Sequence, residues 1–283
     1  MEQFNFHFGS YPNVIALIWE DLQMTNIEEA YVLPNKLKIK YYLMAMHFLK
    51  MYPKDHEQES LWNLDRHTCR DWIWYYVDKI RALKAEKIEW PDDNFMGDIF
   101  VISVDTTHVE SNEPNHLILS FDKDYYSHKY GRSGLSFELG IAIAQQQVVW
   151  MNGPIKPGVY NDIKAFTELG LMSKLKATGK RAIGDSAYVG YPDQVSTKNL
   201  HLDNRAVAGF KRRALSRHEA FNNLLKRFDC LSGRFRHGVD RLGHCFEAVL
   251  VICQYQIETT SPLFNVLIQD VLDKIPEAKS SEV

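Results

Sequence analysis

The sequence has little that would place the chain in a membrane or in an oxidising compartment. No apolar run approaches the roughly 18 residues that a membrane-spanning helix needs, and residues 1–10 lack the basic and apolar regions of a signal peptide. The chain has four cysteines, and none of them stands in a C-x-x-C spacing: Cys69, Cys230, Cys245 and Cys253. These absences argue against a disulfide framework and against a zinc ribbon, and they favour the cytosol or the nucleus.

The net charge of the chain is also small. The formal net charge of the 283 residues is −3 at pH 7, so the chain does not bind nucleic acid through an overall basic surface, and any such activity requires local patches. Apolar residues make up 45% of the chain and charged residues 24%, which is typical of a globular protein. The length allows one large domain with an appendage, or two domains.

Residues 1–90 have the periodicity of helices. Apolar side chains recur at three- and four-residue spacing in 37–51 and again in 66–86, which predicts amphipathic helices packed through one face. A short helix at 60–64 followed by the longer one, which carries Arg66, Arg70 and Arg81, is also the layout of a DNA-binding helix-turn-helix. Many proteins that never meet DNA share this layout, so both interpretations stay open.

From residue 91 onward the pattern changes to strands. Pro91 and the acids after it interrupt the helical period and predict a boundary, and residues 91–275 then form an α/β domain with a mixed sheet flanked by helices. We predict strands at 97–105, 117–121, 135–144, 146–154 and 180–185, a Gly-Pro turn over 153–158, and a helix over 162–178. The polar tail, 276–283, is predicted to be disordered.

Acidic residues end two of these predicted strands. Asp105 follows a buried apolar run, and Asp185 follows another. A third acid, Glu219, lies in a predicted helix. The alternative for Asp105 is a local cap at the end of a strand, and the alternative for Glu219 is a capping box with Ser216 at the beginning of a helix. Asp162 has the position of a helix N-cap, with a supporting role at the site as its alternative.

Aspartates that end adjacent strands would repel one another and would require a cation. Carboxylate oxygens suit Mg²⁺ or Mn²⁺, and two such ions about 4 Å apart support the displacement of a phosphodiester oxygen. Helical spacing from Glu219 brings Arg212, Asn222 and Lys226 near its face, and cations there suit a phosphate backbone. A solvated basic surface is the simpler interpretation of this charge.

Four sequence segments, in this order, resemble the DDE transposases of the PIF/Harbinger class: VDTTH at 104–108, NGPIKPGVYNDIKAF at 152–166, GDSAY at 184–188 and RRALSRHEAFNNLLKRF at 212–228. The resemblance covers roughly residues 97–265. It implies a ribonuclease-H-like domain whose catalytic, metal-binding triad is Asp105, Asp185 and Glu219, with Asp162 as a further candidate ligand. It also implies DNA as substrate, a nuclear location with or without a cytoplasmic pool, and a separate DNA-binding partner protein.

Two positions depart from the pattern of this class and its bacterial relatives. Lys226 fits the lysine that follows the third acid by seven residues, but Leu215 stands where an arginine is usual, which makes Arg217 the candidate replacement. Arg212, Arg217 and Lys226 are therefore the predicted phosphate contacts. The usual Trp-Pro-Gly has become Asn-Gly-Pro-Ile at 152–155.

We therefore expect metal-dependent cleavage and strand transfer of DNA. One rival is a domesticated, non-catalytic DNA-binding or chromatin-associated protein on the same fold, and another is a nuclease that does not transpose.

Overall fold

Along the chain, a helical half comes first, and a mixed half that contains both strands and helices follows. A computed structural model describes residues 2–25, 38–90, 100–112, 122–199 and 203–267. Within them the helical half consists of α1 (Glu2–Phe8), α2 (Pro12–Thr25), α4 (Ile39–Met51), α5 (Asp55–Trp62), α6 (Arg66–Ala82) and α7 (Lys84–Lys87). The predicted boundary at 91, the predicted strand at 117–121 and the tail at 276–283 lie outside the described residues.

The mixed half alternates strands and helices. It consists of β1 (Phe100–Glu110), η2 (Lys123–Tyr125), β2 (Tyr126–Ser127), β3 (Arg132–Ala142), β4 (Val148–Ile155), α8 (Asp162–Glu168), α9 (Leu171–Thr178), β5 (Arg181–Ile183), η3 (Ser186–Tyr188), β6 (Val195–Ser196), α10 (Arg205–Leu225), α11 (Asp229–Ser232) and α12 (Val239–Thr259). The α/β class is therefore confirmed. No described helix has both the length and the apolar character needed to cross a membrane.

The described strands form one mixed six-stranded sheet. β1 lies in its centre, antiparallel to β3 on one side and parallel to β5 on the other. β6 continues the sheet beyond β5 in parallel, and the far edge of β3 pairs with β2 at its beginning and with β4 over most of its length. β1 has 11 residues and β5 has three, so the middle of β1, residues 104–109, is left open on this side, and Phe235 bridges Ser111 beyond it.

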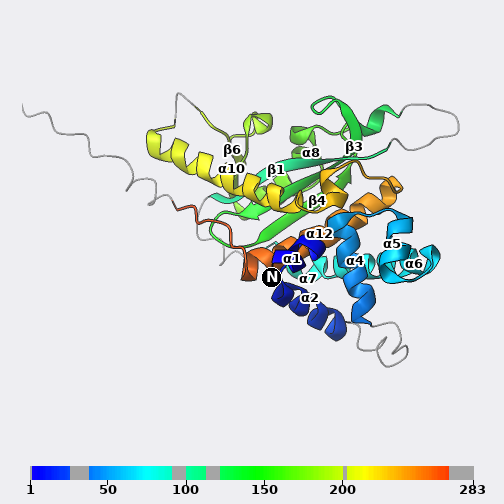
Figure 1. Cartoon of the computed structure of the whole chain (residues 1–283). Helices are drawn as coiled ribbons and strands as arrows, with labels where there is room; N and C mark the ends of the chain where they lie inside the picture. Colours follow the sequence, from blue (N-terminus) through cyan, green and yellow to red (C-terminus); the bar gives the residue numbers. More distant parts are fainter. Residues whose placement is uncertain (1, 26–37, 91–99, 113–121, 200–202, 268–283) are drawn as a thin grey trace, which may run out of the picture.

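Helices cover both faces of the sheet (Figure 1). α10 and α12 lie on one face, where β3 presents Leu135, Phe137, Leu139 and Ile141. On the other face α8 and α9 pack against Val104 through side chains such as Phe166 and Leu175. This alternation follows from the two-residue period of a strand. For the same reason, the polar side chains along β1 are divided between the two faces of the sheet.

The largest hydrophobic core joins the N-terminal helices to the sheet through α12. Its buried residues include Ile18 of α2, Tyr76 of α6 and Phe246 of α12, and the ring of Phe246 stacks on Phe137 of β3 with centroids 3.7 Å apart. The core therefore extends across the predicted division between 1–90 and 91–275. Helices α4 and α6 pack together beneath it, as Figure 1 shows in blue and cyan.

Two local predictions were wrong, and one alternative is excluded. α10 begins at Arg205 with Asn204 as its N-cap, so Glu219 lies inside a helix as predicted, and the alternative of a capping box with Ser216 is excluded. Gly153 and Pro154 lie within β4, and the turn comes later, at 157–159. The helix expected over 162–178 is two helices, because Gly170 has φ 111°, outside the helical region and easily adopted only by glycine.

Candidate active site

The sheet register brings Asp105 and Asp185 to corresponding positions. Ser103 of β1 pairs with Ile183 of β5 in parallel, and each aspartate follows two residues later. β5 ends at Ile183, and the Asp185 side chain caps η3 by accepting a hydrogen bond from the Ala187 amide at 2.8 Å. The predicted adjacency of the two strands is therefore confirmed, although Asp105 lies inside β1 and does not end it.

Asp105 is a half-buried carboxylate at the open edge of β1. Its Oδ1 accepts the backbone N–H of Thr106 at 2.8 Å. Burial raises its pKa to about 6, the Thr106 hydrogen bond opposes this rise, and the charge of Asp185 adds to it. Asp162 adds further, while Lys129 acts in the opposite sense. Because burial is the main cause, a bound cation would stabilise the ionised form of this carboxylate.

Asn222 of α10 is the side chain that contacts Asp105 directly. Its Nδ2 donates to Asp105 Oδ2 at 3.2 Å, and its own Oδ1 is buried without a hydrogen-bond partner. A buried acceptor with no partner is costly unless something binds it. Two carboxylates and an unpaired amide oxygen form a set of hard oxygen donors, and this set fits Mg²⁺ or Mn²⁺. Sequence spacing had already brought Asn222 near the Glu219 face, but it could not show the contact with Asp105.

Asp162 approaches the same region from α8. Asn161, and not Asp162, is the N-cap of this helix, because its Oδ1 accepts the Lys164 amide at 3.0 Å. The Asp162 carboxylate is thereby left to pair with Lys129 at 3.1 Å. Burial alone would lower the pKa of Lys129, but Asp162 and Asp105 outweigh it and raise that pKa. Lys129 lies in the turn before β3, and no sequence pattern singled it out.

Glu219 lies on α10, one helical turn before Asn222. It is exposed, whereas its neighbour His218 is buried and its Nδ1 lies 3.0 Å from the Ser103 hydroxyl. Within the described residues, no three His, Cys, Asp or Glu side chains are close enough together to hold a metal ion. The structure therefore brings the two aspartates together with Asn222, and it leaves the carboxylate of Glu219 outside that group.

Arg217 does not fit the predicted phosphate contact. Its side chain is buried, with 1% of the residue exposed. Nη1 donates to the Ala142 carbonyl at 2.6 Å, Nε donates to the Phe264 carbonyl at 3.0 Å, and Nη2 donates to the Gln145 carbonyl. Burial lowers its pKa to about 10, which leaves it charged at neutral pH. The guanidinium therefore ties α10 to the end of β3 and to the chain after α12, and it faces no solvent.

Lys226 is also turned inward. Its Nζ donates to the carbonyls of His108 at 2.6 Å and of Leu231 at 3.0 Å, and burial lowers its pKa to about 8. Arg212, by contrast, is exposed on α10. Of the three predicted phosphate contacts, Arg212 alone presents its side chain to solvent in the way that a DNA backbone requires.

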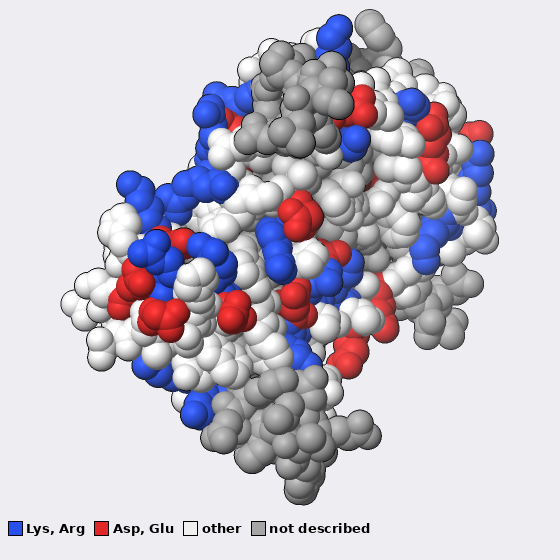
Figure 2. Space-filling view, turned by 90° about the vertical axis from the view of Figure 1, so that its right-hand side faces the viewer, with Lys and Arg blue, Asp and Glu red and all other residues white. Residues whose placement is uncertain are grey.

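The arginines of the predicted helix-turn-helix are paired with acids. Arg70 of α6 contacts Asp55 of α5 at 2.5 Å, and Arg81 contacts Glu247 of α12 at 3.0 Å. Figure 2 shows Lys and Arg interspersed with Asp and Glu over the face it presents, without one broad basic band. The helix-turn-helix therefore stays a prediction.

Comparisons with protein-family models, with curated proteins and with solved structures gave no match to this chain. The candidate site therefore depends on its own geometry.

Proposed function

We propose that the chain is a DDE-type DNA endonuclease derived from a transposase, which hydrolyses and transfers DNA phosphodiester bonds with a divalent metal. The observation that carries the proposal is the pairing of Ser103 with Ile183, since it sets Asp105 beside Asp185 at the open edge of β1. Two carboxylates on adjacent strands are the ligands that a metal-dependent phosphodiesterase uses, and the raised pKa of Asp105, about 6, is typical of a functional site.

The order of the sheet supports a ribonuclease-H-like fold. Along the sheet the strands run β4, β3, β1, β5 and β6, and β3 is the strand antiparallel to both of its neighbours. An acid on β1 and another just after β5, the fourth strand in this order, followed by α10 across one face, agree with the layout that the resemblance implies.

Each residue has a role in this proposal. Asp105 and Asp185, with Asp162 or Asn222 beside them, would hold Mg²⁺ or Mn²⁺. When bound, the metal would supply an activated water and would stabilise the leaving oxygen. Asn222 holds the Asp105 carboxylate in place through its Nδ2. Glu219 lies one turn away on α10, and we propose that its side chain joins the aspartates when metal and DNA are bound. Arg212 would contact a phosphate.

Cleavage of supercoiled plasmid with Mg²⁺ or Mn²⁺ tests the proposal. We expect the wild-type chain to nick the plasmid, and we expect Asp185→Asn to abolish nicking while DNA binding by mobility shift is kept. Asp193→Asn is the matched control, because Asp193 is an exposed aspartate eight residues further along the same segment. Equal nicking by wild type and Asp185→Asn would refute the site.

A second candidate is a domesticated, non-catalytic DNA-binding protein in the nucleus that works with a partner protein. The exposed position of Glu219, apart from the two aspartates, favours it. Mg²⁺ or Mn²⁺ titration by calorimetry, in the presence of a nonspecific duplex, separates the two functions. An endonuclease loses metal binding in the Asp105→Ala, Asp185→Ala double variant, whereas a non-catalytic binder gives the same trace for both proteins.

A further inference from the structure

A cavity of about 380 Å³ lies on the face of the sheet opposite to α10. One wall is the turn before β3, residues 127–130, and the other wall is the segment 157–164 that leads into α8. Thr106 of β1 and Ser136 of β3 form the floor. The volume is that of a site for one small ligand. Thr106 follows Asp105 in β1, so the two side chains point to opposite faces of the sheet. The cavity approaches the proposed active site through Asp162, which lines it.

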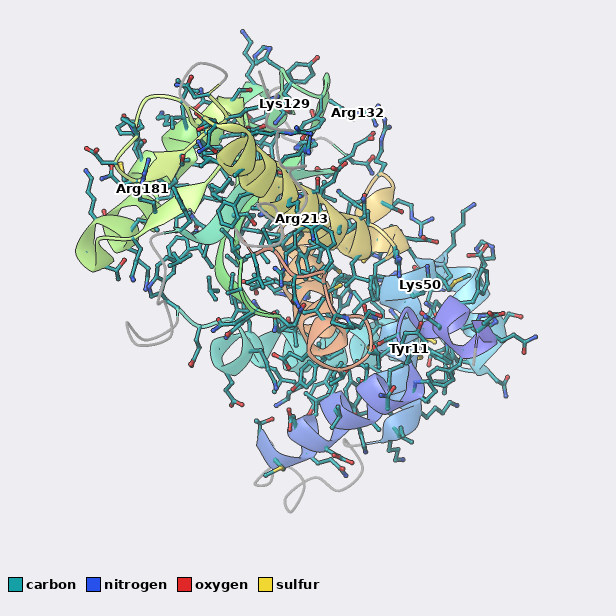
Figure 3. All side chains as sticks on the ribbon, turned by 90° about the vertical axis from the view of Figure 1, so that its left-hand side faces the viewer. Tyr11, Lys50, Lys129, Arg132, Arg181 and Arg213 are labelled. Carbon is teal, nitrogen blue, oxygen red and sulfur yellow. The ribbon has the colours of Figure 1, made fainter. Side chains whose placement is uncertain are left out.

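The walls pair tyrosine rings with lysine ammonium groups. Lys129 Nζ lies 5.6 Å from the ring centroid of Tyr130, and Lys164 Nζ lies 4.9 Å from that of Tyr160. Figure 3 labels Lys129 and Arg132 at the same end of the sheet. Planar rings with cations beside them suit a ligand that is itself planar and carries a negative charge.

The Tyr130 ring is held in a fixed orientation. It lies parallel to the imidazole of His108 at 4.9 Å with an interplanar angle of 11°, and His108 Nδ1 is 3.3 Å from the Ser136 hydroxyl. Burial lowers the pKa of His108 to about 4, so the imidazole is neutral and brings no charge of its own. A fixed aromatic platform loses little entropy when a second ring stacks on it.

The cavity also contains hydrogen-bonding groups suited to a base or a sugar. The Asp162 carboxylate, held by Lys129 at 3.1 Å, is an acceptor in the wall. The Thr106 hydroxyl, 3.1 Å from the Tyr188 hydroxyl, lies in the floor. Aromatic rings, two lysines, one carboxylate and hydroxyls together match the chemistry of a single nucleotide.

We propose that this cavity receives one unstacked nucleotide of the DNA strand on which the active site acts. The inference rests on the proposed function, and it adds a site for the base. Asp162 lines the cavity and is a candidate metal ligand, so a nucleotide in the cavity lies beside a residue proposed to hold the metal. A base inside a duplex is stacked on both sides and has to leave the helix to enter.

Photocrosslinking tests the proposal in the full chain. The probe is a nicked duplex with 5-iodo-2′-deoxyuridine at successive positions beside the nick, with Ca²⁺ present so that no bond is cleaved. Irradiation is followed by mass spectrometry to locate the attached residue. We expect attachment at Tyr130 or Tyr160 from one or two positions of the probe. The yield should fall about tenfold in Tyr130→Ala, which removes the stacking ring, and should be kept in Tyr130→Phe.

Two controls keep the outcomes distinct. Tyr191→Ala removes an exposed tyrosine that does not line the cavity, and it should leave the yield unchanged. Duplex binding by mobility shift, with attachment at neither tyrosine or with full attachment in Tyr130→Ala, would overturn the nucleotide site and leave the endonuclease proposal intact.

The free nucleotide dAMP separates the two possible sources of the ligand. Saturation-transfer NMR with dAMP uses the same variants and requires no cleavage. If wild type does not bind the duplex but transfers saturation to dAMP, and Tyr130→Ala does not, the endonuclease proposal fails. The DNA-strand proposal is then overturned in favour of a site for free nucleotides.

Discussion

α10 and α12 are two helices of equal length, 21 residues each, on the same face of the sheet, and they use that face differently. Most of α12 is buried, and its buried side chains are mainly apolar, among them Phe246, Leu250 and Ile252. α12 buries the neutral amides of Gln254 and Gln256 as well, whereas α10 buries two cations, Lys211 and Arg217. The two helices therefore differ in the charge that they bury.

The difference shows that a basic helix can be basic for internal reasons. Lys211 pairs with Asp203 at 2.6 Å and donates to the Thr197 carbonyl, while Arg217 donates to the Ala142 carbonyl at the end of β3 and Lys226 to the His108 carbonyl of β1. Buried cations persist where carboxylates or several backbone oxygens converge on them. The charge of α10 therefore stabilises the fold first, and only its exposed remainder is available to DNA.

The largest loss of stability is expected for a variant of α12. Phe246→Ala removes a fully buried ring stacked on Phe137, and we expect the free energy of unfolding to fall by about 3 to 5 kcal/mol. Denaturant unfolding measures the change. Phe264→Ala is the control, because 42% of Phe264 is exposed, and it should cost far less. Equal losses would mean that α12 is not the centre of the core.

The second-largest loss of stability is expected for a variant of α10. Arg217→Ala leaves the carbonyls of Ala142, Gln145 and Phe264 without their donor, and we expect a loss of about 2 to 4 kcal/mol in the free energy of unfolding. Thermal unfolding of the variant measures it. If Arg217 instead contacts DNA, the variant keeps its stability and loses affinity for a duplex.

Asp105→Asn should act in the opposite direction. The pKa of Asp105 is about 6 in the folded protein and 3.8 ordinarily, so the folded chain keeps a proton that the unfolded chain has lost. Wild-type stability therefore falls as pH rises from about 4 to 6, and the loss is complete above that window. The variant avoids this loss, and we expect it to be about 1 to 3 kcal/mol more stable than wild type at pH 8 in the absence of divalent metal.

The comparison is checked at two pH values. Near pH 4 the variant and wild type should unfold at similar denaturant concentrations, and Asp193→Asn should match wild type at both. The new amide can donate to Asn222 Oδ1 after a flip of Asn222, so its hydrogen bonds are kept. A destabilised variant at pH 8 would contradict the raised pKa of Asp105 in the folded protein.

The smallest effect on stability is expected for Arg212→Ala. Arg212 is exposed, so its loss should change the free energy of unfolding by less than about 0.5 kcal/mol. Its removal should weaken duplex binding and flatten the salt dependence of that binding, because one phosphate contact is lost. A titration with fluorescent duplex at two salt concentrations measures both. Unchanged affinity would limit α10 to its structural role.

Much of the element order follows from local pattern. The helical spacing of 37–51 and 66–86 predicted α4 and α6, and the apolar runs before Asp105 and Asp185 predicted β1 and β5. Other features could not be predicted from local sequence patterns. The division of the 162–178 helix at Gly170 and the start of α10 at Arg205 depend on backbone conformation and packing.

The candidate site was predicted in part. The sequence named Asp105 and Asp185, since an acid after a buried apolar run needs a partner or a cation. Sequence reasoning also predicted Arg217 and Lys226 as phosphate contacts. Both side chains turn inward, which charge and helical spacing do not show. Nothing local indicated that Lys129 would reach Asp162 across 33 residues.

The sequence by itself determined that this chain is α/β, that helices precede the sheet, and that two acids follow strand-forming runs, because period and composition act over a few residues. Only the tertiary structure decided which strands are neighbours, that Asn222 contacts Asp105, and that Arg217 is buried. These outcomes depend on contacts between residues distant in the sequence, such as Arg217 with Ala142, 75 positions apart, and Asn222 with Asp105, 117 positions apart. Such contacts are fixed by the packing of the whole chain.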